Sequence, residues 1–264
     1  MRNKLLAFLL FFPVVLQAQI SAVDAGKGTE NNNVTDIVVV FKMHFDIGYT
    51  DWAGAVLQKY SGPMLEKTLR FIDQTASLPK NEQFVWTVPG WPLQYMLDNC
   101  SPQNKVRLEK AIKEQRIIPH AMPFTVETES SDMENLTRGL SFADNINRRY
   151  GLKPARDAKF TDVPEHSWVI PTLLKNAGVD MLHIGCNPGS ASPDLPTLFW
   201  WQGPDSSKLL TFYWDKYYGS GILPPKNWPY KTWLAMIMTH ENTGAPDPEY
   251  VAGLLKEARQ KMPH

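Results

Sequence analysis

The run Ile37-Val38-Val39-Val40-Phe41, followed at once by Lys42-Met43-His44-Phe45-Asp46, predicts both a buried strand and a chemical site at its end. Successive side chains of an extended strand point to opposite faces, so His44 and Asp46 project to the same side. An imidazole and a carboxylate are good zinc ligands, and further ligands would come from distant segments or from solvent. Gly48 lets the backbone turn sharply just beyond them. The stretch therefore predicts half of a metal site, although a His-x-Asp pair alone is weak evidence.

A second segment with the same character is Phe160-Thr161-Asp162-Val163-Pro164-Glu165-His166-Ser167-Trp168. Asp162 ends a short run that begins at Ala158, and a proline-containing turn and the helical stretch 171–177 follow it. Loops between a strand and a helix often carry chemistry. The alternative is that Asp162 simply caps the following helix. The presence of both motifs in one chain favours a shared site.

Together the two segments resemble the N-terminal catalytic domain of glycoside hydrolase family 38, the α-mannosidases. In that family the first strand ends in His-x-Asp-x-Gly-aromatic, which His44-Phe45-Asp46-Ile47-Gly48-Tyr49 matches. A later strand ends in an Asp followed four residues on by His-Ser, which Asp162 and His166-Ser167 match. The resemblance runs from about residue 34 to the chain end.

Two departures from the family pattern mark a divergent branch. Ile47 replaces the usual Pro, and Val163-Pro164-Glu165 replaces Pro-Phe-Gly. Family members are also several times longer than this sequence. We therefore expect residues 34–264 to be an incomplete form of the family's N-terminal domain, with a substrate that need not be an ordinary mannoside.

The resemblance also implies roles for individual residues. It implies that His44, Asp46 and Asp162 bind Zn²⁺ and that Asp162 is the catalytic nucleophile. The segment 240–246 resembles a family loop that carries the acid/base, which makes Glu241 the candidate, with Glu in place of the family's Asp. The family's fourth zinc ligand, a downstream histidine, has no match here. The expected substrate contacts are Tyr49, Trp91 and His166.

The leading hypothesis is thus a metal-dependent, retaining, α-mannosidase-like glycoside hydrolase that acts on a glycan. Zinc would hold two hydroxyls of the scissile sugar and act as a template and electrostatic stabiliser. One alternative is a zinc-dependent deacylase of polysaccharides, in which metal-bound water attacks and no sugar adduct forms on Asp162. Another is a non-catalytic, sugar-binding remnant of the fold.

The order of elements predicts an α/β fold, a largely parallel, barrel-like (β/α) domain with helices around the sheet. Helix starts are indicated by Ser101-Pro102, by the capping-box spacing of Ser131 to Glu134, and by Asp247-Pro248, while Gly178 ends the helix after Pro171. His120 and His183 lie in apolar runs and are expected to be core or loop histidines with satisfied ring nitrogens rather than ligands. Trp91 is expected at a loop tip, where core packing and sugar stacking are equally favoured. The predicted strands are Ile37–Lys42, Phe84–Thr87, Arg116–Ala121, Ala158–Thr161, Asp180–Gly185 and Leu209–Tyr213.

The N-terminus and the composition indicate where the protein acts and which partners are disfavoured. Residues 1–18 combine Arg2 and Lys4 with an apolar stretch and a small residue, the order of an export signal, so a periplasmic or extracellular protein without stable membrane insertion is expected. Residues 19–33 are polar and predict a flexible linker. The 27 basic residues balance the 27 acidic ones without a cationic run, which disfavours a nucleic-acid partner. Cys100 and Cys186 could pair or remain free, and nothing in the pattern indicates an oligomeric state.

Overall fold

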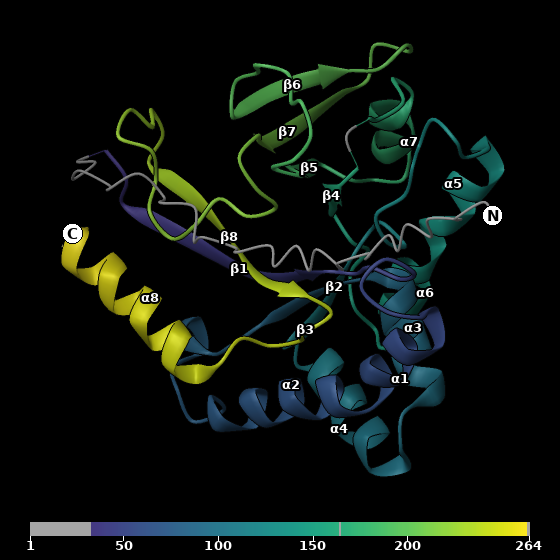
Figure 1. The fold of residues 1–264 in the computed structure, drawn as a ribbon, viewed down its shortest axis with the longest axis vertical. Helices are drawn as coiled ribbons and strands as arrows, with labels where there is room; N and C mark the ends of the chain where they lie inside the picture. Colours follow the sequence, from purple (N-terminus) through teal and green to yellow (C-terminus); the bar gives the residue numbers. More distant parts are fainter. Residues whose placement is uncertain (1–32, 164, 263–264) are drawn as a thin grey trace, which may run out of the picture.

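The computed structural model describes residues 33–163 and 165–262, in which strands and helices alternate along most of the chain (Figure 1). The predicted export signal and all but the last residue of the predicted linker lie outside these residues. None of the described helices is long and apolar enough to cross a membrane. The strands are β1 Asp36–His44, β2 Trp86–Pro89, β3 Ile117–His120, β4 Asp157–Asp162, β5 Met181–Cys186, β6 Leu198–Gln202, β7 Lys208–Trp214 and β8 Thr232–Glu241. The helices are α1 Ala53–Ser61, α2 Pro63–Gln74, η1 Lys80–Glu82, α3 Gly90–Asn99, α4 Pro102–Lys113, α5 Met133–Gly139, α6 Ser141–Arg149, α7 Ile170–Asn176 and α8 Pro248–Lys261.

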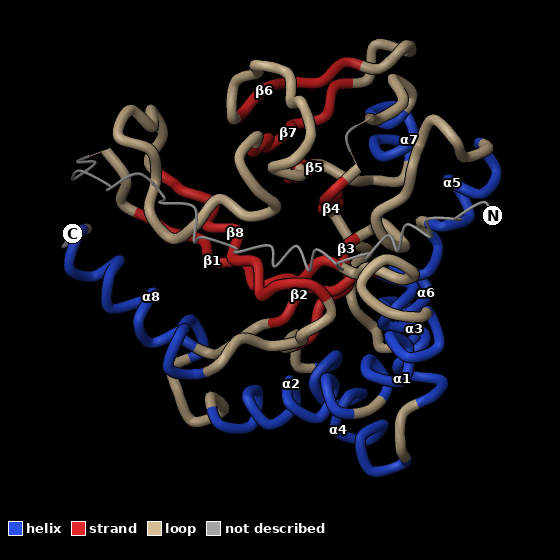
Figure 2. Tube along the Cα trace, viewed as in Figure 1, coloured by secondary structure: helices blue, strands red, loops and turns tan. Residues whose placement is uncertain are grey.

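The strands form two four-stranded sheets in the orders β3-β2-β1-β8 and β4-β5-β7-β6. Every described strand pair is parallel except β6 with β7, so β6 is an antiparallel edge strand. The N–H of Ala121, just after β3, donates to the carbonyl of Asp157 on β4 at 2.8 Å and links the two sheets. In Figure 2 most helices line the lower and right-hand sides of the first sheet, and α7 lies beside the second sheet. The predicted α/β, barrel-like class is confirmed, as an arrangement of two sheets rather than a closed barrel.

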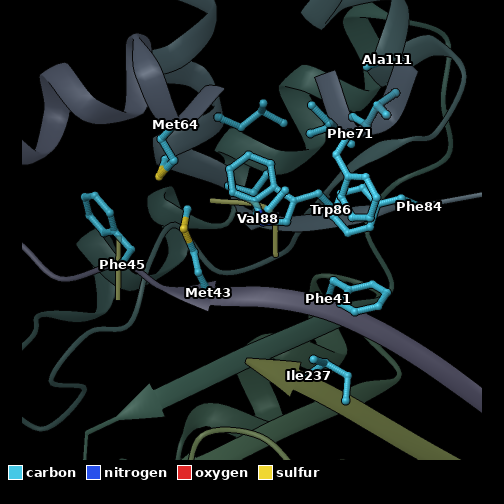
Figure 3. Close-up of a cluster of buried hydrophobic side chains, with 14 of the residues drawn as sticks. Phe41, Met43, Phe45, Met64, Phe71, Phe84, Trp86, Val88, Ala111 and Ile237 are labelled. Atoms are coloured by element: carbon cyan, nitrogen blue, oxygen red, sulfur yellow. The ribbon is translucent and has the colours of Figure 1, made fainter. Parts of the chain in front are cut away.

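Strand β1 is the centre of the first sheet, and its two faces have different neighbours. Phe41, Met43 and Phe45 belong to a large buried apolar cluster that includes Met64 and Phe71 of α2 (Figure 3). Because side chains alternate along a strand, Lys42 and His44 point the other way, toward the second sheet, and both are buried. The apolar face thus fixes the strand against the helical layer and aims His44 inward.

Local start and stop signals in the sequence were accurate at several elements. Ser101 caps α4 by accepting the N–H of Asn104 at 3.2 Å, and Gly178 follows α7 with φ +81°. The cap of α5 is Asp132, which accepts the N–H of Asn135 at 2.8 Å, so the box predicted from Ser131 is wrong by one residue. A carboxylate one residue closer to the helix competes successfully for the same orphan N–H groups.

Other elements differ from the sequence-based expectations. Strand β2 begins at Trp86, two residues later than predicted, and the Phe84 carbonyl ahead of it accepts the Nε–H of Arg116 at 2.7 Å. Strands β6 and β8 were not predicted. Both cysteines are free thiols, Cys186 buried and Cys100 half-buried, so the pairing alternative is not realised.

Gly185 on β5 packs directly against the backbone of Tyr218, which lies in the segment 215–221 that leads toward β8. A Cβ atom on Gly185 would lie 2.5 Å from the carbonyl oxygen of Tyr218, a backbone atom that cannot rotate away. The same segment then reaches β8, where the N–H of Gly221 donates to the Met236 carbonyl at 3.4 Å. A side chain at position 185 would therefore displace Tyr218.

We expect Gly185→Ala to destabilise the fold by about 1–3 kcal/mol, because an extra methyl overpacks a rigid backbone contact. Gly253→Ala on α8 is the matched control, because nothing lies within 4 Å of the added Cβ, and it should be neutral or stabilising by up to about 1 kcal/mol. Denaturant unfolding of the two variants checks this. Equal stability of both variants would contradict the close approach.

Candidate active site

His44 and Asp162, 118 positions apart in the sequence, face each other across the two sheets. The His44 Nε2 atom lies 3.6 Å from Asp162 Oδ2, and Nδ1 lies 2.8 Å from the hydroxyl of Thr161. Burial lowers the pKa of His44 to about 4, with a further contribution from the positive charge of Lys42 and opposition from Asp162 and Asp46. His44 is therefore neutral near pH 7, the form in which an imidazole binds a metal.

The two carboxylate oxygens of Asp162 have different surroundings. Oδ1 accepts hydrogen bonds from Asn187 Nδ2 at 2.6 Å and from the Tyr218 hydroxyl at 2.5 Å, whereas Oδ2 faces His44. The amide orientation of Asn187 is fixed independently, because its Oδ1 accepts the Gly189 N–H at 2.8 Å. The carboxylate is thus held at one oxygen and open at the other.

The backbone of Asp162 is strained. Its φ is +76°, and the Val163 N–H donates to the Thr161 carbonyl at 3.0 Å, the geometry of the rarer γ-turn. A residue other than glycine costs about 1–3 kcal/mol in such sparsely populated conformations, and they concentrate at functional sites. The surrounding hydrogen bonds hold this turn in place and project the carboxylate out of the sheet.

Asp46 lies beside this pair, but its carboxylate is turned toward its own loop. Oδ2 accepts the Thr50 N–H at 3.0 Å, and the loop is clamped by Asn242, which donates to the Asp46 carbonyl at 2.7 Å and to the Thr50 hydroxyl at 2.8 Å. Within residues 33–163 and 165–262, no three His, Cys, Asp or Glu side chains converge closely enough to hold a metal ion. The nitrogen and oxygen donors of His44 and Asp162 fit zinc chemically, and Asp46 as the third ligand stays a prediction.

Glu241 ends β8 next to His44, at an irregularity in the strand pairing. The register advances by two residues on β1, from Lys42 to His44, and by three on β8, from Met238 to Glu241. This bulge, with His240 at φ +72°, re-aims the end of β8, as bulges beside active sites often do. Burial raises the pKa of Glu241, and the negative charges of Asp46 and Asp162 raise it further against His240. Glu241 is thus disposed to keep a proton.

The three predicted substrate contacts occupy different environments. Tyr49 is 92% exposed and precedes Thr50, which bonds Asp46, so it stands at the rim of the site. Trp91 is in the first turn of α3, not at a loop tip, and its ring packs against Phe45 at 5.9 Å. That ring also contacts Phe124 at 5.9 Å, so the core interpretation accounts for much of its surface.

His166, the third predicted substrate contact, stacks on Phe160 with ring centroids 4.3 Å apart. Both of its ring nitrogens are buried without a hydrogen-bond partner among the described residues. Burial lowers its pKa to about 4. His166 is therefore a neutral group beneath the Asp162 turn, with two ring nitrogens that no described side chain satisfies.

The inward-facing residues below the site are basic. His120 and His183 are buried as predicted, but the expected hydrogen-bond partners are not found, because none of their ring nitrogens has a partner among the described residues. Burial lowers the pKa of both histidines well below the usual value, and the charges of Lys42 and Lys159 lower it further. Lys159 contacts the carboxylate of Asp157. Burial also lowers the pKa of Lys42 and of Lys159 to about 7, so the layer below the site consists of buried histidines and lysines in which burial favours the neutral forms.

Four residues of the site were not predicted from the sequence: Thr161, Asn187, Tyr218 and Asn242. Asn187 and Thr161 adjoin strand ends that the sequence did indicate, so their position was a usable signal. Tyr218 and Asn242 belong to loops on either side of β8, a strand that the sequence did not indicate. Their contacts with Asp162 and Asp46 depend on long-range packing, which no local pattern reveals.

Comparison with known proteins adds independent evidence. The model of the glycosyl hydrolases family 38 N-terminal domain matches residues 34–263. No curated protein sequence matches the chain. An α-mannosidase from Enterococcus faecalis V583 superposes with a TM-score of 0.65 at 16% identity, over 86% of this chain and 27% of that one. A glycosyl hydrolase family 38 protein from Enterococcus faecalis gives 0.58 at 13% identity, over 89% and 26%.

A third solved structure also shares the fold. The 4-α-glucanotransferase from Thermococcus litoralis has a TM-score of 0.54 at 14% identity, over 84% of this chain and 37% of that one. At these identities the superpositions show the fold alone. The chain spans about a quarter of the length of the two Enterococcus structures.

The buried histidines generate a prediction about pH. Because the folded pKa of His183 lies below its unfolded value of about 6.5, the unfolded chain binds more protons at acid pH, so stability falls as the pH drops below about 6.5. We expect His183→Gln to reduce this slope by up to about 1.4 kcal/mol per pH unit. His240→Gln, at an exposed position, is the control and should leave the slope unchanged. Urea unfolding between pH 7 and pH 4.5 measures it, and identical slopes in the two variants would refute the assignment.

Proposed function

The chain belongs to glycosyl hydrolase family 38 through its N-terminal domain, and on that premise we propose that it carries the catalytic face of a retaining, metal-dependent glycoside hydrolase. The proposed substrate is a glycan with α-mannosidic or related bonds. The observation that carries the proposal is the setting of Asp162, an acidic side chain on a strained turn, with one oxygen held by two donors and the other facing a neutral imidazole. The same proposal places the protein outside the cytoplasm, through the export signal expected in residues 1–18.

The proposed chemistry divides the work between two carboxyl groups. A retaining glycosidase uses one carboxylate as nucleophile and a second carboxyl group, about 5–5.5 Å away, as acid and then base. Asp162 would attack the anomeric carbon while the glycosidic C–O bond breaks. Glu241 would give its proton to the departing oxygen and then take one from the water that releases the sugar. The raised pKa of Glu241 supports the acid role, because the shift favours the protonated carboxyl group.

Tyr218 and Asn187 would position Asp162. Their two hydrogen bonds to Oδ1 hold the carboxylate in one orientation, with Oδ2 facing His44. Burial raises the pKa of Tyr218, with further contributions from Asp162 and Glu241, so its hydroxyl remains a donor. The exposed ring of Tyr49 at the rim offers a face for stacking against a sugar.

His44 and Asp162 would hold Zn²⁺, with Asp46 joining after a rotation of its side chain away from Thr50. When bound, zinc supplies positive charge that orients hydroxyls of the sugar. Because burial keeps His44 neutral, its imidazole can bind a cation without first losing a proton. Asp46 already sits on the loop clamped by Asn242, so only its side chain has to turn.

The metal proposal predicts that the chain binds one zinc ion and that His44→Ala and Asp46→Ala each weaken binding by at least about tenfold. The reason is that each variant removes one donor from a small set. Asp98→Ala, which removes an exposed carboxylate on α3, is the control. Elemental analysis of the purified proteins, with competition against a chelating indicator, measures the affinity. Equal zinc in all four proteins would refute the site.

The catalytic proposal predicts that Asp162→Ala lowers turnover of an α-mannoside by at least about 10³-fold. A slow-reacting fluorinated glycosyl substrate should leave a sugar covalently bound to the peptide that contains Asp162. Asp98→Ala, on the exposed part of α3, is the control and should behave like the unchanged chain. Hydrolysis that persists in Asp162→Ala without any adduct would favour attack by metal-bound water, the deacylase chemistry.

Glu241→Gln tests the proposed acid role of Glu241. We expect a loss of about 10²–10³-fold for substrates with poor leaving groups and a far smaller loss for activated aryl glycosides, because an activated group needs little protonation. Rates on a series of aryl mannosides test this. An equal loss on every substrate would remove Glu241 from the acid role.

A further inference from the structure

Thr161 connects the two motifs of the site through a buried hydrogen bond. It is 1% exposed, immediately precedes Asp162, and its Oγ1 lies 2.8 Å from the Nδ1 atom of His44. The other ring nitrogen of His44, Nε2, faces Asp162 Oδ2 at 3.6 Å, beyond hydrogen-bond reach. The orientation of the His44 ring therefore depends on Thr161 at one nitrogen and leaves the other free.

A third residue, Thr125, extends this contact. Its Oγ1 accepts the backbone N–H of Thr161 at 3.1 Å and lies 3.2 Å from the Thr161 hydroxyl. Either hydroxyl can be the donor between them. The side chains of His44, Thr161 and Thr125 thus form a short chain in which each link can run in two directions.

The two directions correspond to the two neutral tautomers of His44. With the proton on Nδ1, the ring donates to Thr161 Oγ1, the Thr161 hydroxyl donates to Thr125 Oγ1, and Nε2 presents a lone pair to Asp162. With the proton on Nε2, the Thr161 hydroxyl donates to Nδ1 instead. A carboxylate or a carbonyl in place of Thr161 could only accept, and would allow the first tautomer alone.

We propose that Thr161 is a positioning residue that holds His44 through Nδ1 in both tautomers, so that Nε2 binds a cation without any rotation of the ring. The proton on Nε2 passes to solvent, while Nδ1 takes the Thr161 hydroxyl proton, Thr161 takes the Thr125 hydroxyl proton, and the half-buried Thr125 hydroxyl takes one from solvent, so the imidazole stays neutral. The metal part of this inference rests on the function proposed above, whereas the hydrogen bond and its two directions do not. Outer hydrogen-bond partners of metal-binding histidines typically affect metal affinity about 10–100-fold.

The test uses the whole chain and three variants. Thr161→Val is nearly isosteric and keeps the backbone N–H bond to Thr125, while Thr161→Ser restores the hydroxyl. Thr211→Val is the matched control, because Thr211 is also buried in a strand and its hydroxyl bonds the Leu209 carbonyl at 3.3 Å, with no contact to His44. Ring-nitrogen NMR of ¹⁵N-histidine-labelled protein reports the tautomer and its hydrogen bonds, with His44→Gln used to assign the signals.

Without metal, we expect the ring-nitrogen shifts of His44 to move in Thr161→Val and to stay unchanged in Thr161→Ser and Thr211→Val. With added ZnSO₄, the Nδ1 atom of the unchanged chain should carry the proton, and Thr161→Val should bind zinc about 10–100-fold more weakly than Thr161→Ser. Unchanged metal-free shifts in Thr161→Val would overturn the inference. If the unchanged chain binds no zinc at His44, the proposed metal site fails, and the metal-free spectra still decide the role of Thr161.

A second variant covers the case in which Thr161→Val does not fold. Thr125→Val leaves Thr161 in place and removes the acceptor for its hydroxyl, so the Thr161 proton should turn to Nδ1 and shift His44 toward the Nε2–H tautomer. We expect that shift in the metal-free spectrum, with zinc affinity lowered at the same time. A His44 spectrum identical to that of the unchanged chain would contradict the relay.

Discussion

The rest of the structure depends on the requirement that β1 satisfy two environments at once. One face carries Phe41, Met43 and Phe45 into the apolar cluster beneath the helices, and the other carries Lys42 and His44 into the space between the sheets. A shift by one residue would exchange the two faces and bury the wrong set. The apolar face therefore fixes the register of the polar one, and the position of His44 follows from hydrophobic packing on the opposite side of the strand.

Residues at the strand ends adopt strained backbone conformations, and hydrogen bonds hold them there. Asp162, His240 and Asn242 all have positive φ although none is glycine, and all three lie at or beside the site. Hydrogen bonds compensate: Asn187 and Tyr218 hold the Asp162 carboxylate, and the Asn242 side chain clamps the loop after β1. Strain at the ends of β4 and β8 and in the residue that follows β8 is consistent with a rigid scaffold that presents a preorganised polar edge.

The sequence supported the fold class and the central pair of the site because both follow from local patterns. The apolar run before His44 and the short run before Asp162 each identify a strand and its end, and in parallel folds those ends meet at one edge. The hydrogen bonds of Tyr218 to Asp162 and of Asn242 to Asp46 could not be predicted, since each joins residues that are far apart in the sequence. The bulge that re-aims Glu241 is also invisible locally, because one inserted residue changes the pairing without changing the pattern. The rotation of Asp46 toward Thr50 is a matter of side-chain hydrogen bonding, which spacing along a strand does not determine.

The central claim is that His44 and Asp162 form one site in which a cation and a sugar meet. The most direct measurement is anomalous diffraction at the zinc edge, from crystals of the chain grown with zinc and a fluorinated mannoside. Our interpretation predicts an anomalous peak beside His44 Nε2 and Asp162 Oδ2, together with continuous density from the anomeric carbon to an oxygen of Asp162. A map without a peak at this pair, and with the sugar unbound or attached elsewhere, would contradict it.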